Sequence, residues 1–186
     1  MPRAGVTTEG VVSAAMKIAD AGGLPAVTLA SLADTLKIKP PSLYKHIDSL
    51  DEVYRALAVR GIREATARLQ HATVGKSGDE ALFALARAYW QFARERPGLY
   101  AASLRPPKAG ENDIAAAGEA LIGTLTAVLS GYGLKGDDAR HAVRGLRAII
   151  HGFVSLDAAG GFRLRLDLNE SFDRVLGALA RDLTLR

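Results

Sequence analysis

Residues 28–47 read TLASLADTLKIKPPSLYKHI, and this stretch decides the expected fold. Thr28 is placed to cap a short helix, and Pro40 and Pro41 suit the first turn of the next one, where a missing amide hydrogen costs nothing. Two short helices joined by a tight turn at 37–39 are the layout of a helix-turn-helix, whose second helix enters the DNA major groove. The second helix carries polar side chains that a buried helix would not need, namely Ser42, Tyr44, Lys45 and His46.

The same stretch also separates an apolar set of residues from a basic one. The apolar positions can form a small core against a preceding helix, and they are Leu29, Leu32, Leu36, Ile38, Leu43 and Ile47. Residues 37–46 contain three lysines and no acid, which focuses positive charge on one segment. Ser42 and Lys45 lie three positions apart on one face, so they could meet base edges or phosphates. From charge and periodicity alone, a solvated helix begun by proline is an equally good interpretation.

Composition sets the limits within which this motif is interpreted. The chain has 186 residues, of which 48% are hydrophobic, and its formal net charge of +4 permits nucleic-acid binding without requiring it. No run of 18 apolar residues predicts a transmembrane helix, and the first ten residues lack the apolar core of a signal peptide. The absence of cysteine excludes disulfides, thiolate zinc sites and a cysteine nucleophile. We therefore expect a cytoplasmic protein with no membrane contact.

Helical periodicity extends over almost the whole chain, and no alternating strand pattern is convincing. Serine followed three residues later by glutamate, as at Ser49 and again at Ser77, is the signature of a capping box that begins a helix. Residues 105–112, RPPKAGEN, are the clearest loop. The pattern predicts an all-α fold with about nine helices. Apart from a short turn through Tyr100, these cover about 8–22, 28–36, 40–47, 49–72, 77–96, 113–132, 137–159 and 169–185.

Residues 5–65 resemble the DNA-binding domain of the TetR family of bacterial transcriptional regulators. The match runs in order through VVSAAMKIADAGG, VTLASLADTLKIKPPSLYKHI and SLDEVYRAL. The resemblance implies a DNA-binding domain over 5–65 with its helix-turn-helix at 28–47, and a helical ligand-binding and dimerisation domain over 66–186. Together with the first motif helix, whose N-terminus could receive a phosphate, it implies this set of DNA-contacting residues: Thr28, Lys37, Lys39, Pro40, Pro41, Ser42, Tyr44, Lys45 and His46.

The chain departs from the family pattern at three positions of the motif. Lys37 stands where a glycine is common, and Ile47 where an aromatic residue is common. Leu50 stands where the family usually has a lysine that binds phosphate, so DNA docking would rely more on the lysines of 37–45. In the second domain, RPGLY at 96–100 with a later His-Gly-Phe is similar to a C-terminal domain type known for a Trp-His-Gly pattern.

The resemblance implies a small-molecule effector site among the central helices of the second domain. Its candidates are residues on stripes that would face one another: Tyr89, Trp90, Ala93, Tyr100, Leu104, Leu121, Leu125 and Phe153. The alternative is that these residues are plain core, because aromatic and aliphatic side chains at helical spacing are mostly buried packing residues. Among them, Tyr89, Trp90 and Tyr100 have polar tips that would need a partner if buried.

A second apolar stripe predicts contacts between copies of the chain. Its residues are spaced as in helix-on-helix packing, and with the last helix they would form a four-helix dimer interface. The candidates are Val143, Leu146, Ile150, Phe172, Val175 and Leu179. The alternative is that the stripe packs inside one chain. We expect a homodimer, because twofold symmetry doubles the DNA contacts of a single small motif.

Catalytic residues are not predicted. His151 has Ser155 on its own helical face, but Asp157 does not align with it, and neither a nucleophile elbow nor a metal-ligand pair occurs. We therefore expect no enzyme, no metal and no cofactor. The expected function is a homodimeric, ligand-responsive repressor that binds double-stranded operator DNA and is released by a small-molecule effector. The alternatives are an activator or a regulator without a small ligand, and an all-helical small-molecule-binding protein or enzyme with no DNA-binding role.

Overall fold

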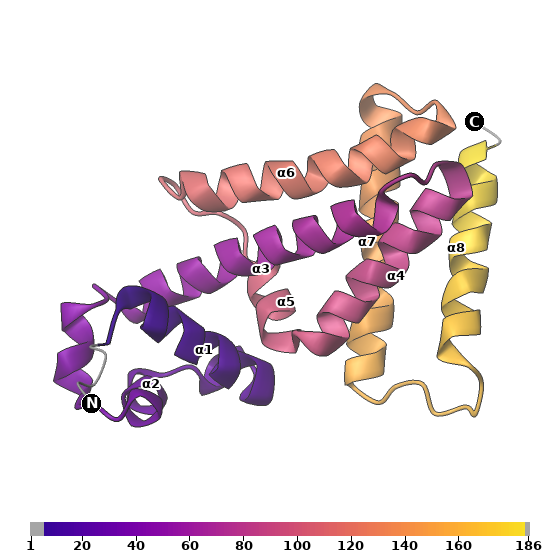
Figure 1. Cartoon of the computed structure of the whole chain (residues 1–186). Helices are drawn as coiled ribbons and strands as arrows, with labels where there is room; N and C mark the ends of the chain where they lie inside the picture. The colour runs from indigo at the N-terminus through magenta and orange to yellow at the C-terminus, as the bar shows by residue number, and fades with distance from the viewer. Residues whose placement is uncertain (1–5, 185–186) are drawn as a thin grey trace. The chain divides into compact units, whose positions relative to one another are not determined.

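The chain folds into helices, as the periodicity predicts. The computed structural model describes residues 6–184, and within them there are eight α-helices, three short 3₁₀ helices and no strand (Figure 1). This confirms the all-α fold class. The elements are α1 (Thr8–Gly22), η1 (Leu24–Ala26), α2 (Leu29–Leu36), η2 (Pro40–Lys45), α3 (Leu50–Thr73), α4 (Gly78–Glu95), α5 (Pro97–Ser103), α6 (Asn112–Leu129), η3 (Ser130–Tyr132), α7 (Gly136–Ala158) and α8 (Leu168–Thr184).

Side-chain caps determine where the first two α-helices begin. The Thr7 hydroxyl accepts a hydrogen bond from the amide of Gly10 (3.0 Å) and so caps α1. Thr28 caps α2 as predicted. Its hydroxyl accepts from the amide of Ser31 (3.0 Å), while the Ser31 hydroxyl accepts from the amide of Thr28 (2.9 Å). These bonds satisfy amide groups that have no partner within the helix.

The turn between α2 and η2 requires a left-handed residue, and that residue is Lys37. Its φ of 55° and ψ of 43° make it the one non-glycine residue with positive φ among residues 6–184. The amide of Ile38 donates to the carbonyl of Ala33 (3.0 Å) across this turn and closes the end of α2. Glycine adopts this conformation without the Cβ clash that other residues incur. The geometry therefore explains why glycine is favoured at this position.

The chain divides into two compact units that do not follow the predicted boundary throughout. The first unit is the chain up to Glu64 together with Glu95–Ala117, and the second is Ala65–Arg94 together with the chain from Gly118 onward. The first break in the chain, after Glu64, lies near residue 65, where the resemblance places the end of the DNA-binding domain, and the domain assignment itself stays a prediction. Residues 95–117, predicted as part of the second domain, instead belong to the unit that contains the helix-turn-helix. The chain passes between the units three times: inside α3, just before the last residue of α4, and inside α6.

Helix α5 belongs to the first unit because it is fastened to α1. Asp20 of α1 accepts hydrogen bonds from the amides of Gly98 (2.9 Å) and Leu99 (3.2 Å), at the start of α5. Arg96 donates to the other oxygen of Asp20 (2.6 Å) and to Glu64 of α3 (3.1 Å). A Cβ built at Gly98 would lie 2.2 Å from the carbonyl carbon of Ala19, so only glycine allows this approach. Charge pairing and close backbone contact together fix α5 in place.

The second unit is centred on aromatic rings from three helices. Trp90 of α4 packs against Phe172 of α8, with ring centroids 4.7 Å apart, and against Phe153 of α7 at 5.9 Å. Phe153 also contacts Phe162, in the segment between α7 and α8, at 5.2 Å. Figure 1 shows α7 and α8 running beside each other, joined by that segment. Helix α8 begins at Leu168, one residue earlier than predicted, and the side chain of Asp167 accepts the capping bond from the amide of Asn169 (2.8 Å).

The predicted dimer stripe is largely internal to the chain. Val143, Leu146, Ile150 and Phe172 are buried within the second unit, whereas Val175 is exposed and Leu179 is half-buried. Side chains already covered by their own chain are not available to a partner, so the alternative of internal packing holds for these four. The periodicity identified the buried face of α7, and the contacts between two copies stay a prediction.

Helix α6 and the turn after it are unusually apolar. The segment Asn112–Tyr132 is long and apolar enough to cross a membrane by length and composition, with a mean hydropathy of 1.5, and 33% of it is buried. Within the second unit, its leucines Leu121, Leu125 and Leu129 are buried. Core helices of helical domains have the same composition, so this single segment is weak evidence for a membrane span.

Candidate functional site

The helix-turn-helix presents a mixed basic and aromatic surface on η2. Leu43 is fully buried and anchors the segment, while Tyr44 beside it is 57% exposed. Lys45 is also exposed, and Ser42 and His46 are half-buried. An exposed aromatic side chain next to a lysine is more typical of a binding surface than of a surface that only covers the protein core. The predicted contact residues of the second motif helix therefore share one surface segment.

The 3₁₀ character of η2 sharpens which side chains act together. A 3₁₀ helix has three residues per turn, so positions three apart lie directly above one another. Ser42 and Lys45 form one such row, and Pro41 and Tyr44 form the next. The prolines at its start fix the backbone there and leave no amide that lacks a partner. At its end, the carbonyl of His46 accepts a bond from the hydroxyl of Thr8 (2.8 Å), which ties the segment to α1.

The remaining predicted DNA-contacting residues lie on the same unit, but they differ in whether their polar groups are already hydrogen-bonded. Lys37 and Lys39, on the turn, are exposed, as are Pro40 and Pro41. Thr28 is exposed, but its hydroxyl and amide are both engaged with Ser31 in the cap of α2. This leaves the exposed lysines better placed than Thr28 to receive a phosphate.

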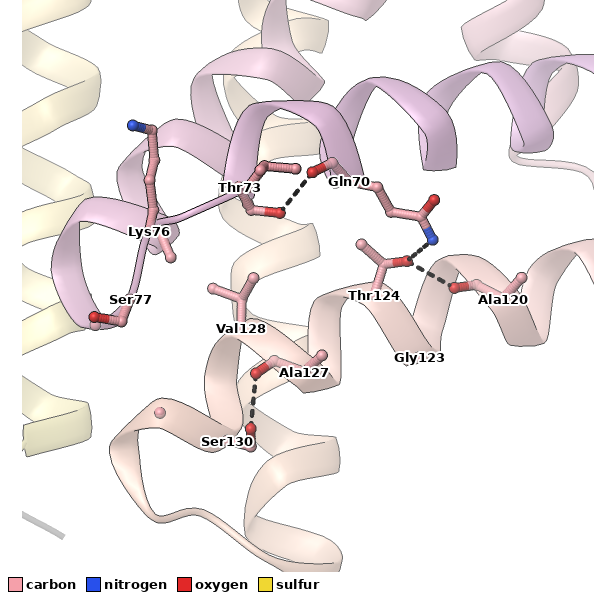
Figure 2. Close-up of a pocket in the computed structure, with 14 residues that line it drawn as sticks. Gln70, Thr73, Lys76, Ser77, Ala120, Gly123, Thr124, Ala127, Val128 and Ser130 are labelled. Carbon is pink, nitrogen blue, oxygen red and sulfur yellow. Dashed lines mark hydrogen bonds between the residues drawn. The ribbon is translucent and has the colours of Figure 1, made fainter.

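The second unit contains an open pocket of about 690 Å³ between the end of α3, the start of α4 and one face of α6 (Figure 2). In Figure 2 the side chain of Gln70 reaches from α3 to Thr124 of α6, and its amide donates to the Thr124 hydroxyl (3.2 Å). Small residues of α6, among them Ala120, Gly123 and Ala127, form one wall. Lys76 is the one charged residue that lines the pocket, and its ammonium group is paired with Glu80 (2.8 Å).

Three of the four hydroxyl groups that line this pocket donate to backbone carbonyls. Thr124 donates to the carbonyl of Ala120 (3.0 Å), and Ser130 donates to that of Ala127 (2.7 Å). Thr73 donates to the carbonyl of Leu69 (3.0 Å). The pocket thus offers small apolar walls with few free polar groups, which suits an uncharged, mostly apolar molecule.

None of the predicted effector-binding residues lines this pocket. Tyr100 is buried and Leu104 is exposed, and both belong to the first unit. The other six belong to the second unit: Tyr89, Trp90, Ala93, Leu121 and Leu125 are buried and Phe153 is half-buried. The structure brings Trp90 and Phe153 together in the aromatic cluster described above. Burial raises the pKa of the Tyr89 hydroxyl above its ordinary value.

Trp90 has one unusual property. It is 4% exposed, yet its indole N–H is the one buried side-chain nitrogen or oxygen among residues 6–184 that has no hydrogen-bond partner. The guanidinium of Arg94 lies over the ring at 5.6 Å from its centroid. Leaving a buried donor unpaired costs about 1–3 kcal/mol. The N–H of Trp90 is therefore a group that an acceptor atom on a bound molecule would stabilise.

Sequence reasoning missed the pocket because its lining comes from separate segments of the chain. One signal was available: Ala120, Gly123 and Ala127 repeat at helical spacing, and such a stripe leaves room beside a helix. Small residues at that spacing also occur where two helices pack closely, so the stripe alone would not have identified a pocket. The polar pair of Gln70 and Thr124 has no signature in the sequence.

Comparison with known proteins agrees with this architecture. The family described as "Tetracyclin repressor-like, C-terminal domain" matches residues 82–179. The uncharacterized HTH-type transcriptional regulator YobS of Bacillus subtilis (strain 168) is 37% identical over 170 residues, which cover 91% of this chain and 88% of the relative.

Two solved structures share the fold. BioQ with its double-stranded DNA operator has a TM-score of 0.69 at 22% identity, covering 98% of this chain and 100% of that one. A TetR variant from Acinetobacter baumannii AYE, in complex with minocycline, has a TM-score of 0.69 at 20% identity, covering 96% of each chain. The family match and the similarity to YobS, together with the helix-turn-helix and the helical second unit, show the family. The chain belongs to the TetR family of DNA-binding, helix-turn-helix transcriptional regulators.

Proposed function

We propose that this chain is a homodimeric repressor that binds operator DNA through η2 and is released by a small, mostly uncharged effector. The observation that carries the proposal is the surface of η2, where the exposed residues Tyr44 and Lys45 directly follow the fully buried anchor Leu43. That arrangement holds the backbone still while the side chains remain free to meet base edges and phosphates. The operator complex of BioQ, a protein of the same fold, supports this proposal.

The proposed dimer uses a face of α7 that is half-buried to exposed in the single chain. Gly145, Ile149, Gly152 and Leu156 lie along one face of this helix, at spacings of four, three and four. A Cβ built at Gly145 or Gly152 would meet nothing within 4 Å, so space beside both glycines is open in the single chain. Small residues let two helices approach closely. A dimer carries two η2 segments, and dimers with helix-turn-helix motifs place the two in successive major grooves, about 34–36 Å apart.

A leucine at Gly152 tests the dimer without disturbing the monomer. Gly152→Leu adds a side chain where the single chain leaves room, and leucine favours a helix more than glycine does. We expect the variant to sediment as a monomer with unchanged helix content, and to bind DNA more weakly. Gly118→Leu is the control, because its Cβ would also meet nothing but it lies on α6. If Gly152→Leu remains dimeric, this face of α7 is not the interface.

The effector is proposed to bind in the second unit, in the pocket at Gln70 and Thr124 or at the unpaired N–H of Trp90. The minocycline complex of a protein with the same fold supports a ligand in such a unit. The effector is expected to bind more tightly to the form of the protein that has low DNA affinity. By linkage, the effector then lowers the affinity for DNA by some factor, and DNA lowers the affinity for the effector by the same factor. Trp90 is the single tryptophan of the chain, so its fluorescence can report effector binding directly.

We further propose that the chain is cytoplasmic and has no enzymatic activity. The Ser155 hydroxyl lies 3.4 Å from Nε2 of His151, but both residues are exposed on α7. Asp157, the third member of a possible triad, pairs instead with Arg94 (3.4 Å). The carboxylate that would orient the histidine is therefore engaged elsewhere. Among residues 6–184, His, Asp and Glu side chains form no cluster of three that could hold a metal ion.

Binding to the DNA upstream of the chain's own gene tests the central proposal. Fluorescence anisotropy at several salt concentrations should show tight, sequence-selective binding that weakens steeply with salt. Tyr44→Ala should weaken this binding about tenfold while the protein stays folded. Leu164→Ala, which removes an exposed side chain from the second unit, is the control and should bind as the wild type does. Equal affinity for upstream and unrelated DNA at every salt concentration would exclude operator recognition.

A further inference from the structure

The DNA-reading segment is followed directly by acidic residues. Asp48, Asp51 and Glu52 come within a few residues of Lys45, at the start of α3. Glu52 is engaged as a cap, because its carboxylate accepts a bond from the amide of Asp48 (2.6 Å). Asp51 has no such role in the helix and projects into solvent. Left alone, a carboxylate at this position would repel the phosphates that the neighbouring lysines attract.

Asp51 is paired with cations from the loop between α5 and α6. The ammonium group of Lys108 lies 3.0 and 3.1 Å from the two carboxylate oxygens of Asp51. The guanidinium of Arg105 lies 3.4 Å from one of them. The hydrogen bond from Lys108, followed by the charges of both cations, holds the pKa of Asp51 below its ordinary value. All of these residues belong to the first unit.

The loop holds Lys108 in position by a second carboxylate. Glu111, which is buried, accepts two bonds from Arg105 (2.7 and 2.9 Å). It also accepts a bond from the amide of Lys108 (2.7 Å), and its own amide donates to the carbonyl of Lys108 (3.1 Å). The turn at 108–111 is therefore closed on itself. It holds the backbone of Lys108 in place, so that the exposed ammonium group lies beside α3.

The position of Asp51 brings this pair close to the DNA-reading segment. The capping bond from the amide of Asp48 to Glu52 (2.6 Å) folds the start of α3 back onto the residues that follow η2, so Asp51, next to Glu52 in sequence, lies near the end of η2. An uncompensated carboxylate there would repel a phosphate that approaches the end of η2, and at physiological salt this repulsion acts over about 8 Å.

We propose that Lys108, on the loop between α5 and α6, is a determinant of operator affinity that acts by neutralising Asp51 at the start of α3. The proposal rests on the DNA-binding role assigned to η2. It assigns a function in DNA binding to a residue outside the helix-turn-helix, in a part of the sequence expected to serve the effector domain. Lys108 is a positioning residue in this scheme, because it acts through Asp51 and not by contacting DNA itself.

A double-mutant cycle measures the proposed action. Lys108→Ala should weaken operator binding by roughly 2–5-fold, the range typical of an exposed ion pair. Asp51→Asn should bind at least as tightly as the wild type, because the carboxylate is gone. In the Asp51→Asn background, Lys108→Ala should have no further effect. Both side chains are exposed, so the variants are expected to keep the fold.

Any other outcome of the double-mutant cycle contradicts the proposal, and the outcomes can be told apart. If Lys108→Ala binds as the wild type does, the loop has no part in DNA affinity. If it loses the same factor in the Asp51→Asn background, Lys108 acts on DNA without Asp51, and a salt dependence shallower by about one ion would identify a phosphate contact. Lys135→Ala, which removes an exposed lysine of the second unit, controls for net charge. If the wild type itself shows no selective binding, the proposed function fails as well.

Discussion

In the first unit, α5 is fixed to α1 by charge pairs and glycine contacts, whereas in the second unit α4, α7 and α8 meet through aromatic rings. Arg96, Asp20 and Glu64 form the first kind of contact, with the amides of α5 as further donors. Trp90 and Phe172 typify the second. Hydrogen-bonded ion pairs depend on direction and distance, while apolar packing depends mainly on area and fit. The two units should therefore respond differently to the same kind of substitution.

The largest expected effect is the loss of a fully buried ring in the second unit. Phe172→Ala should lower the free energy of unfolding by about 3–5 kcal/mol, because it removes apolar contacts and leaves a cavity. Urea denaturation followed by the fluorescence of Trp90, which lies in the same unit, measures it. Val175→Ala, nearby on α8 but exposed, should cost less than about 1 kcal/mol. Equal losses in the two variants would mean that the aromatic cluster does not stabilise this unit.

A substitution in the first unit should reveal the close approach of α5 to α1. Gly98→Ala places a Cβ 2.2 Å from a backbone carbon of α1, so one helix has to move, at a cost of about 3 kcal/mol. Circular dichroism during denaturation and the affinity for upstream DNA together measure it. Gly118→Ala on α6 meets nothing within 4 Å and should stabilise the protein by about 0.5–1 kcal/mol. A stable Gly98→Ala variant with normal DNA affinity would contradict the close contact.

One ion-pair cluster of the first unit and one ion pair of the second differ in exposure, and this difference predicts their contributions to the free energy of unfolding. Arg96→Ala removes partly buried bonds to Asp20 and Glu64 and should cost about 2 kcal/mol. Arg87→Ala removes a bond of similar length to Asp173 (2.6 Å), but the Arg87 side chain is 57% exposed, so the loss should stay below about 1 kcal/mol. Urea midpoints of the two variants give the comparison. If the order is reversed, charge pairing is not what holds α5.

The smallest expected effect concerns the turn of the helix-turn-helix. Lys37→Gly removes the left-handed strain at this position, although glycine also loses more entropy on folding. The two effects oppose each other, so we expect a change within about 1 kcal/mol, toward greater stability. Thermal unfolding measures it. DNA affinity should fall in the same variant because a lysine beside η2 is lost, and a variant that is both less stable and equally tight would contradict the account of this turn.

The helix-turn-helix could be predicted from the sequence because its determinants are local. Thr28 caps the helix that it precedes, the two prolines begin η2, and Leu43 anchors it, all within one short stretch. The 3₁₀ form of η2 and the left-handed backbone at Lys37 were not predicted. The bond from the amide of Ile38 to the carbonyl of Ala33 closes the turn at Lys37. The end of η2 is held by the Thr8 hydroxyl of α1, and the local pattern does not contain that contact.

The second unit could be predicted only in part, since its sites combine distant segments. Periodicity identified the buried face of α7 but could not say whether the same chain or a second copy covers it, and Val143, Leu146 and Ile150 are covered by their own chain. The pocket needs Gln70 and Thr124 to meet, which no spacing rule predicts. The grouping of residues 95–117 with the first unit likewise rests on contacts between distant residues.

The passage of the chain between units has a consequence for how such regulators can be recombined. A chimera that joins the first 65 residues of this chain to the remainder of a relative would separate Asp20 and Gly61 from the α5 that they contact. The new α5 would have to supply its own arginine and glycine at the matching places. A graft that carries residues 95–117 along with the helix-turn-helix keeps this contact intact. The unit of exchange is therefore discontinuous in sequence, although the DNA-reading motif itself is a single short stretch.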